Sequence, residues 1–400
     1  MLSTNPSCRT TAYKTPYWAV NIQAYLPASG FLLAGILVPT TQTAVTEVLR
    51  LIMTTSPTLR QLAEARDFLI GASTGYLPLI NEPRYRELAA TEFNLLSPGG
   101  AFLISEMHDG NAPFRLSEAL PKLDAQVDFA LEHGAQVQSF HLIWFLEASW
   151  APWLNDLGGR RREFISARIR DVMTLYEGKV GSYNVVNEAF EKDGTLRGEV
   201  SQETDNWLYE GETAERYGYI EYAFREARKA DPNAKLYYND YGTEYDGPKW
   251  DAVLEMVRYF KETGVPIDGV GFQTHLNMKW GRLPKPAELA EHMVQLDALG
   301  LATRVTEFDI GIDPRNNDVY AAYSEAERLK IQAQTYKGFL QVCLDAPNCD
   351  AFQMWGIGDV NSWFSDPAWD GTPAAKPLIH DDLYKPKQAY VALREALQQT

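Results

Sequence analysis

The chain has 400 residues, of which 45% are hydrophobic, 12% aromatic and 22% charged. This balance excludes a disordered tail and a coiled coil, and the length allows one large domain or two ordinary ones. The formal net charge is -16. Because a phosphate backbone attracts clustered Lys and Arg, we expect no nucleic-acid partner.

The first segment in chain order is apolar but short. Residues 31–38 (FLLAGILV) form the longest apolar run. This run is well below the roughly 18 residues that span a bilayer, so we expect no membrane span. It has the length of a signal-peptide core, and residues 40–44 are compatible with a cleavage site. Residues 1–56 are therefore interpreted as an export segment or a packed N-terminal extension.

From about residue 57, short apolar runs alternate with amphipathic stretches. Eight runs have the character of strands: 68–73, 93–96, 140–145, 183–186, 236–241, 270–276, 304–310 and 352–357. Helical patterns cover 161–179, 212–230, 250–263, 286–299, 325–344 and 388–397. This alternation predicts an α/β fold, a (β/α)8 TIM barrel that forms a single catalytic domain over 57–400. The competing doubly wound sheet is disfavoured, because neither the G-x-G-x-x-G nor the G-x-x-x-x-G-K-[ST] motif occurs.

A glutamate closes the stretch at two of these runs. Glu188 ends YNVVNE (183–188) at the fourth run, and Glu307 ends RVTE (304–307) in the seventh. Barrel active sites lie at the carboxyl ends of the strands, where two carboxylates can flank a glycosidic bond. One would stay protonated as an acid, and the other would stay ionised as a nucleophile. The alternative for each Glu taken alone is a solvated or salt-bridged side chain.

Other polar and aromatic residues fall at the same strand ends. His275 ends the sixth run, where it would hydrogen-bond Glu307 and orient it, and Asn187 would bond the sugar 2-hydroxyl. Tryptophans at or just after the third and eighth runs would stack on sugar rings or form a hydrophobic plug: Trp144, Trp355 and Trp363.

Seven segments carry a family resemblance: LRQLAEARDFLIGA (59–72), YNVVNEA (183–189), LYYNDY (236–241), GVGFQTHL (269–276), TEFDI (306–310), WGIGDVNSW (355–363) and LYKPKQAYVAL (383–393). They resemble the signatures of glycoside hydrolase family 10 over roughly 57–400, and the NVVNEA and TEFDI pair in this order is the most specific part. The family consists of retaining (β/α)8 barrels, mostly secreted endo-β-1,4-xylanases. The resemblance therefore implies cleavage of xylan or a related β-1,4-linked plant polysaccharide.

The resemblance also implies residue roles. Glu188 would be the acid/base and Glu307 the nucleophile of a double displacement that needs no cofactor and no metal. Further substrate-binding residues would be Asn187, Gln273, His275, Tyr241, Trp144, Trp355 and Trp363. We expect a polysaccharide or oligosaccharide substrate and a monomeric protein.

The cysteines bear on where the protein works. Cys343 and Cys349 are six residues apart and could close a short loop or remain a reduced, buried pair, and Cys8 is left over. The resemblance implies a disulfide between Cys343 and Cys349. An oxidised pair favours a secreted or extracellular protein.

Several positions depart from the family pattern. SPGGAFLI (97–104) stands where the family reads TPENEMKW, so Gly99, Gly100 and Leu103 replace residues that grip a xylose unit on the glycone side. FHLIWF (140–145) stands where the family reads HTLVWH, so Phe140 and Phe145 replace two His. Loss of donors weakens recognition of sugar hydroxyls. These changes either reduce xylan binding or redirect the site to another β-glycan, and endo or exo action stays open.

Other classes of function have weaker support. A sugar-binding barrel without turnover is the main alternative. A serine hydrolase is suggested by G-x-S-x-G at 71–75, but residues 76–79 (YLPL) are not expected to start the helix that this motif requires. No H-E-x-x-H motif occurs, so we expect no metal site. His108 and His141 lie on the same predicted rim, as site residues or as core and surface residues.

Overall fold

The computed structural model describes the backbone at 32–33 and 36–37, and residues 56–108, 116, 120–197, 208, 217–315 and 317–399. The chain divides into two compact units, Met1–Ser56 and Pro57–Thr400. In the first, β1 (Leu32–Leu33) pairs with β2 (Ile36–Leu37) in antiparallel orientation. The rest of the segment interpreted as an export signal, and Cys8, lie outside the described residues.

The second unit is a closed parallel barrel, so the predicted (β/α)8 fold is confirmed. Its strands follow the chain around the barrel, and β10 pairs with β11 to close it. They are buried on both faces, which explains their nearly continuous apolar sequences. The strands are β3 (Leu69–Thr74), β4 (Leu95–Pro98), β5 (Gln136–Trp144), β6 (Ser182–Asn187), β7 (Lys235–Asp240), β8 (Gly269–Phe272), β10 (Ala302–Gly311) and β11 (Cys349–Met354).

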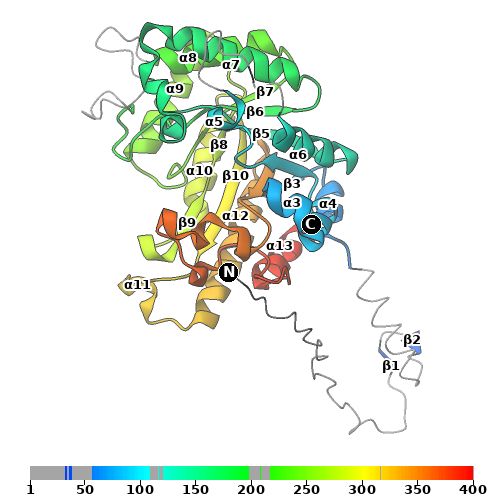
Figure 1. Cartoon of the computed structure of the whole chain (residues 1–400). Helices are drawn as coiled ribbons and strands as arrows, with labels where there is room; N and C mark the ends of the chain where they lie inside the picture. The colour runs from blue at the N-terminus through cyan, green and yellow to red at the C-terminus, as the bar shows by residue number, and fades with distance from the viewer. Residues whose placement is uncertain are drawn as a thin grey trace, which may run out of the picture. The chain divides into compact units, whose positions relative to one another are not determined.

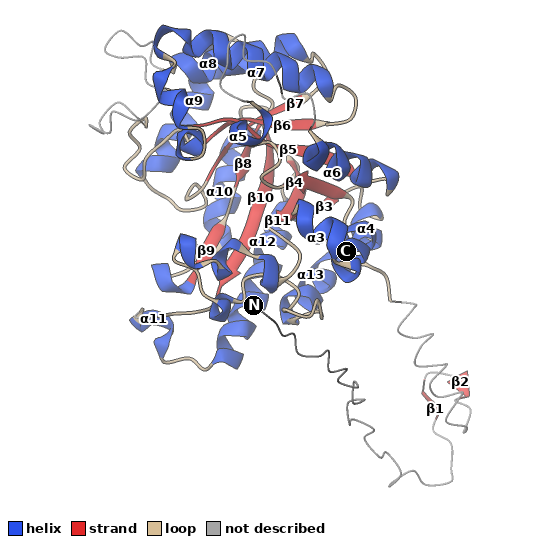
Figure 2. Ribbon diagram, in the orientation of Figure 1, coloured by secondary structure: helices blue, strands red, loops and turns tan. Residues whose placement is uncertain are grey.

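Helices surround the strands (Figures 1 and 2). The longer ones are α4 (Pro83–Glu92), α6 (Pro121–Glu132), α7 (Arg161–Leu175), α8 (Gly218–Ala230), α9 (Pro248–Thr263), α10 (Pro286–Asp297), α12 (Glu325–Asp345) and α13 (Gln388–Gln398). Shorter ones are α2 (Leu59–Glu64), α3 (Tyr76–Asn81), α5 (Ile104–Met107) and α11 (Asp318–Ala321). Local sequence sets their ends: Ser324 and Glu327 form a capping box before α12, and Gly264 ends α9 with φ 67°.

The structure corrects some expected elements. The sixth run is interrupted, because β8 ends at Phe272 and the short strand β9 (His275–Asn277) resumes pairing along β10. The third run starts earlier and ends at Trp144, since Phe145 begins the 3-10 helix η1 (Phe145–Ser149). The helical pattern expected at 212–230 begins at Gly218, and residues 212–216 lie outside the described part.

The expectation that no helix follows residue 75 was wrong. Helix α3 (Tyr76–Asn81) begins directly after Gly75, although Pro78 lies in its first turn. Proline is tolerated there because the first N–H groups of a helix have no partner within the helix. A serine nucleophile is disfavoured for a different reason. Ser73 lies within β3 and has no positive φ, so it is not on the strained turn that such a nucleophile needs.

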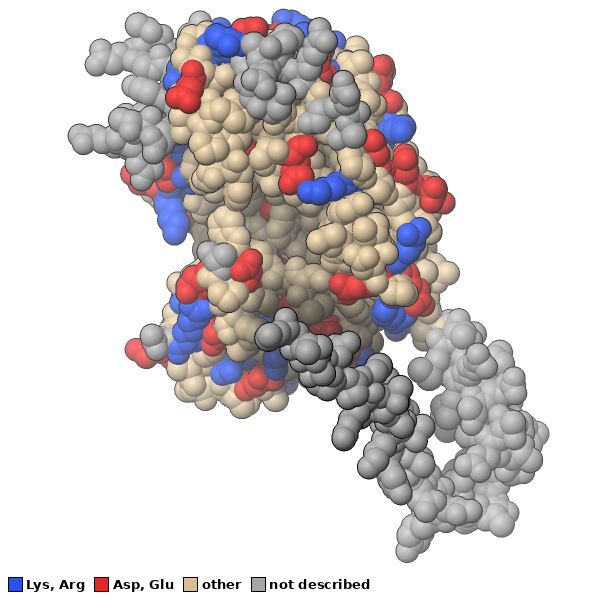
Figure 3. Space-filling model, viewed as in Figure 1, with Lys and Arg blue, Asp and Glu red and all other residues tan. Residues whose placement is uncertain are grey.

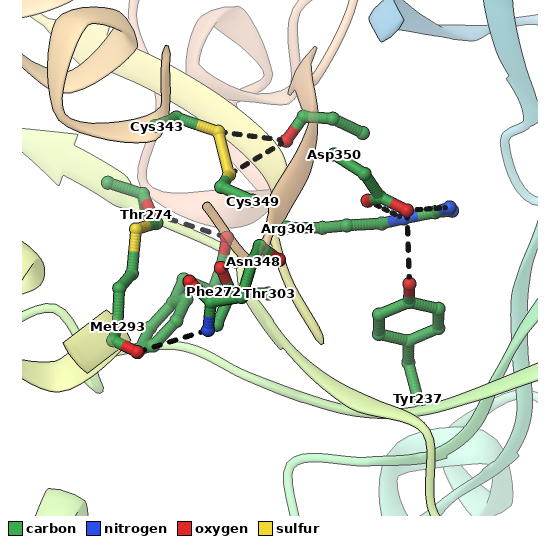
Figure 4. Close-up of a disulfide and its surroundings, with 11 residues drawn as sticks. Tyr237, Phe272, Thr274, Met293, Thr303, Arg304, Cys343, Asn348, Cys349 and Asp350 are labelled. Carbon is green, nitrogen blue, oxygen red and sulfur yellow. Dashed lines mark hydrogen bonds and ion pairs between the residues drawn. A yellow bond between two sulfur atoms is a disulfide. The ribbon is translucent and has the colours of Figure 1, made fainter. Parts of the chain in front are cut away.

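The amino end of the barrel is closed around one buried arginine. The Arg304 guanidinium pairs with both oxygens of Asp350, at 2.6 and 2.9 Å. It also donates to Gln138 and Ser182 and lies 4.6 Å from the ring centre of Tyr237. Figure 4 shows this pair beside the disulfide. Because the buried charge is paired and hydrogen-bonded, the barrel base tolerates it.

Cys343 of α12 and Cys349 of β11 form the expected disulfide (Figure 4). The bond closes a short loop that joins the last long helix to the strand that closes the barrel. Asn348 within this loop donates to the carbonyls of Met293 and Leu301. The loop is thus held to α10 and to the residue that precedes β10.

Replacing both cysteines with serine is expected to lower the free energy of unfolding by about 2 kcal/mol, because a short closed loop restricts the unfolded chain. Denaturant unfolding of the oxidised protein and of the double variant measures this difference. Cys8→Ser is the matched control and should leave the midpoint unchanged. An unchanged midpoint in the double variant would show that the bond adds no stability.

Charged side chains are mixed on the surface. On the face seen in Figure 3, Lys and Arg lie among Asp and Glu and form no continuous basic patch among the described residues. No described helix is long and apolar enough to cross a membrane.

Candidate active site

The polar residues predicted for the site converge at the carboxyl ends of neighbouring strands. Asn187 is the last residue of β6 and Glu188 follows it. Gln273 follows β8 and His275 starts β9. Glu307 lies in β10. The structure brings these five residues into one hydrogen-bonded cluster.

Glu188 has an unusual backbone conformation. Its φ is 56°, a region that non-glycine residues rarely adopt. Neighbours on both sides hold it there: its N–H donates to the carbonyl of Asn239, and Arg197 Nε donates to its carbonyl at 2.8 Å. Such strain persists only where the surroundings fix it, and it is typical of functional sites. The turn directs the carboxylate into the barrel mouth.

The Glu188 carboxylate is nearly buried, with 9% of the residue exposed. Its Oε1 accepts from Gln273 Nε2 at 2.9 Å and from Asn187 Nδ2 at 3.1 Å. Burial raises the pKa of Glu188, and the carboxylates of Asp240 and Glu307 raise it further. The Gln273 N–H and the nearby Trp144 indole lower it in part. A carboxyl group in this environment stays protonated to higher pH than usual.

Glu307 is held from two sides. Its Oε1 accepts from Asn239 Nδ2 at 2.8 Å, and its Oε2 lies 3.1 Å from His275 Nε2. The expected contact between His275 and Glu307 is therefore present. The same Asn239 amide donates to Asn187 Oδ1 at 2.8 Å. One amide group thus connects the surroundings of Glu307 to those of Glu188.

The surroundings of His275 favour its positively charged form. Burial opposes this charge, but the carboxylates of Asp309 and Glu307 outweigh burial and raise the pKa of His275 to about 10. Nδ1 contacts Asp309 Oδ1 at 2.8 Å, so both ring nitrogens donate to carboxylates. Asp309 Oδ2 accepts from the Trp363 indole at 2.8 Å. The successive hydrogen bonds between Trp363 and Asp309, between Asp309 and His275 and between His275 and Glu307 fix the orientation of the Glu307 carboxylate.

Comparison with known proteins agrees with this arrangement. The family model described as glycosyl hydrolase family 10 matches residues 58–396. The chain belongs to glycosyl hydrolase family 10. It is therefore a glycoside hydrolase, and the predicted resemblance and enzyme class are confirmed.

Proteins similar to this chain include several named as xylanases. Endo-1,4-β-xylanase B of Thermotoga neapolitana is 32% identical over 346 residues, which are 85% of this chain and 92% of that protein. The crystal structure of xylanase 10B from Thermotoga petrophila RKU-1 in complex with xylobiose has a TM-score of 0.74 and 30% identity, covering 86% of this chain and 98% of that one. Xylanase10C from Cellvibrio japonicus in complex with xylopentaose has a TM-score of 0.74 and 28% identity, covering 86% and 69%.

The aromatic residues predicted for this family 10 site lie around the two carboxylates. The buried Trp144 indole Nε1 makes no hydrogen bond within the described residues, although it is near enough to lower the pKa of Glu188. Trp355 and Trp363 approach the His275 ring edge-on, with centroid distances of 5.9 and 5.1 Å. Tyr241 accepts from Arg197 at 2.7 Å and lies under the Lys249 ammonium, so it is held at the β7 end of the site.

The positions that depart from the family pattern carry apolar side chains or none. Phe140 stacks on Trp355 with ring centres 4.8 Å apart, and the Arg197 guanidinium lies 4.1 Å from the ring centre of Phe145. Gly99 is tightly packed, since a Cβ there would lie 2.7 Å from Ser73 Oγ. Leu103 is half-buried, and Gly100 has φ 71°. None of these residues presents a polar side chain to the site.

The two histidines considered on the predicted rim are core residues. His141 Nε2 contacts Glu147 Oε1 at 3.2 Å, and both side chains are almost fully buried. His108 is buried against Phe164 with ring centres 5.3 Å apart. The described residues contain no group of His, Cys, Asp and Glu suited to hold a metal ion.

Two further residues of the site lie within recognised motifs but had no predicted role. Asn239 lies within LYYNDY and Asp309 within TEFDI. Both are fully buried polar side chains near the ends of barrel strands, where an unpaired polar group is costly. A polar residue within an otherwise apolar strand was the feature of the sequence that could have indicated a role for Asn239 and Asp309.

Proposed function

We propose that the chain is a retaining β-glycoside hydrolase acting on β-1,4-linked plant polysaccharide, xylan or a related hemicellulose, with Glu188 as acid/base and Glu307 as nucleophile. The observation that carries the proposal is the different surroundings of the two carboxylates. Burial and nearby negative charge favour the protonated form of Glu188, whereas Glu307 receives hydrogen bonds from the His275 imidazolium and from Asn239. Two carboxylates in different environments are what an acid and a nucleophile require.

In the first step, Glu307 attacks the anomeric carbon while Glu188 gives its proton to the leaving oxygen. In the second step, Glu188 takes a proton from water, which then displaces Glu307 from the sugar. Because Asn239 and His275 occupy both sides of the Glu307 carboxylate, little reorientation precedes attack. Asn187 donates to Glu188 and accepts from Asn239, which also bonds Glu307, and it would bind the 2-hydroxyl of the reacting sugar. The mechanism uses no cofactor.

A second candidate is a family 10 hydrolase redirected to another β-glycan or β-glycoside. The apolar contact between Phe140 and Trp355, and the glycines at 99 and 100, favour it, because these positions cannot hydrogen-bond a sugar hydroxyl through their side chains. A sugar-binding barrel without turnover is less well supported, because sugar binding alone does not require two connected carboxylates. We further propose a secreted, monomeric protein, and the disulfide supports the secreted location.

Product release from a panel of β-linked glycans tests the proposal. The panel contains xylan, arabinoxylan, mixed-linkage glucan, cellulose, mannan and aryl β-xylosides, each also incubated with Glu307→Ala. Cleavage of xylan that requires Glu307 is expected. Cleavage of another glycan with little action on xylan would favour the redirected hydrolase. No cleavage of any substrate would contradict both hydrolase proposals and favour the binding barrel.

Gln273→Met is expected to move the alkaline limb of the kcat/KM profile to higher pH. The Gln273 N–H stabilises the ionised form of Glu188 and so lowers its pKa. Without this donor the pKa of Glu188 rises, and the proton needed for leaving-group departure is retained to higher pH. Gln332→Met is a matched control, since the buried Gln332 bonds, among the described residues, to the carbonyls of Ile310 and Lys376. A shift of the limb to lower pH would contradict the assignment of Glu188 as the acid.

A further inference from the structure

The loops after β5 and β11 meet above the strands between them. The order around this part of the barrel is β11, β3, β4 and β5 (Figure 2). Glu188 lies after β6, on the other side of β5. Since Glu188 protonates the leaving group in the proposed mechanism, the aglycone lies on the β6–β7 side and the glycone lies over β3 and β4. Contacts from β5 and the loop after it to the loop after β11 therefore cross the glycone side.

The first such contact is deep in the site. Phe140 of β5 stacks on Trp355, which follows β11, with ring centres 4.8 Å apart and an interplanar angle of 24°. Trp355 also contacts His275 edge-on. The pair therefore begins next to the group that orients Glu307. We call Phe140 and Trp355 the inner bridge.

The second contact lies at the outer rim. Trp150, at the end of η1 after β5, contacts Trp369 of the 3-10 helix η7 (Pro367–Trp369) after β11, with ring centres 6.2 Å apart. Trp150 packs on Trp144 at 5.4 Å, and Trp369 packs on Trp363 at 6.3 Å. We call Trp144, Trp150, Trp369 and Trp363 the tryptophan arch. It runs from the residue beside Glu188 to the residue bonded to Asp309.

The strand ends beneath the two bridges have few side-chain groups that could hydrogen-bond a sugar chain. The loop after β4 presents Gly99, Gly100 and the half-buried Leu103. These residues have no side-chain hydrogen-bond donors or acceptors, whereas a sugar unit bound there would have to exchange hydroxyl–water bonds for protein contacts. Both access and recognition are therefore reduced beyond the first glycone sugar.

We propose that the inner bridge and the tryptophan arch limit the glycone side to a single sugar, so that the enzyme removes sugars one at a time from the non-reducing ends of xylan chains, oligosaccharides and β-glycosides. The inference rests on the proposed retaining mechanism and adds the substrate class to it. Chain ends enter the pocket, while internal stretches of a polysaccharide do not.

The test compares 4-nitrophenyl β-xyloside with 4-nitrophenyl β-xylobioside, which share a leaving group and differ by one glycone sugar. The expected ratio of kcat/KM values is below about threefold, because the second sugar finds no subsite. A preference of tenfold or more for the xylobioside would overturn the proposal. Xylohexaose labelled at its reducing end should release xylose from the unlabelled end, and internal fragments as first products would also overturn it.

Variants of the bridge residues test whether the inner bridge and the tryptophan arch cause the expected lack of preference for the xylobioside. Phe140→Ala combined with Trp369→Ala should raise the xylobioside preference at least fivefold, because the second sugar then gains access. Trp369 is 47% exposed, so its removal leaves the core intact. Trp280→Ala is the matched control, since Trp280 is 57% exposed and contacts Phe364 outside the arch. An unchanged preference in the double variant would overturn the role of the bridges.

A binding measurement separates this inference from the proposed function. Calorimetric titration of Glu307→Ala with both aryl glycosides reports the glycone side without turnover. If the wild-type protein hydrolyses neither compound but the variant binds both equally well, the proposed function fails and the one-sugar pocket stands. If the variant binds the xylobioside ten times more tightly than the xyloside, the one-sugar pocket is contradicted, whether or not the wild-type protein hydrolyses either compound.

Discussion

Replacing Glu307 with alanine is expected to reduce turnover of every β-glycoside substrate by 10⁴-fold or more, the order of loss seen when a nucleophile is removed. The reason is that no other described carboxylate is bonded to both His275 and Asn239. The space left by the side chain should admit azide, which attacks the anomeric carbon directly. The product should be a glycosyl azide of inverted configuration, identified by nuclear magnetic resonance.

The azide product distinguishes loss of the nucleophile from loss of the fold. A variant that unfolds would not be rescued, so thermal unfolding of both proteins is the control. Retained turnover above a few per cent, or an azide product of retained configuration, would contradict the assignment of Glu307 as nucleophile. The His275 imidazolium should remain in place in the variant, because Asp309 still binds it.

Glu188→Ala is expected to separate substrates by their leaving groups. General acid catalysis contributes about 10²–10⁴-fold, and only a poor leaving group needs the proton. We therefore expect kcat/KM for unactivated xylo-oligosaccharides to fall on the order of 10³-fold, while that of 2,4-dinitrophenyl β-xyloside falls less than about tenfold. Steady-state kinetics on both substrates measures the difference.

The two alanine variants also check each other. Azide added to Glu188→Ala should attack the sugar already bound to Glu307 and give a product of retained configuration, opposite to that from Glu307→Ala. Equal losses on the two leaving groups, or the same azide anomer from both variants, would contradict the division of roles.

The barrel was predictable because its strands are short apolar runs at regular intervals along the chain. The boundaries of the strands were less predictable. Gln273 and Thr274 separate β8 from β9, and Thr274 has φ 60°. No apolar pattern marks such a break. Helix α3 was missed because Pro78 reads as a helix breaker, although its place in the first turn makes it harmless.

The site was predictable where single residues end strands. Glu188, Glu307 and His275 stand out because each follows an apolar run. The importance of Asn239 depends instead on which side chains surround it, and these come from two other strands, β6 and β10. The contact between Trp150 and Trp369 likewise depends on two loops far apart in the chain, so no local pattern indicates it.

Asn239 has a consequence for the ageing of the protein. A neutral amide is needed between the two carboxylates, yet asparagine is among the side chains that hydrolyse spontaneously over time. Conversion to aspartate would place a third negative charge beside Glu307. The side chain is fully buried in β7 and bonded to Asn187, Glu307 and Thr306, which keeps it away from the following backbone nitrogen. The contacts that arrange the site therefore also protect the Asn239 amide against hydrolysis for as long as β7 stays paired in the barrel.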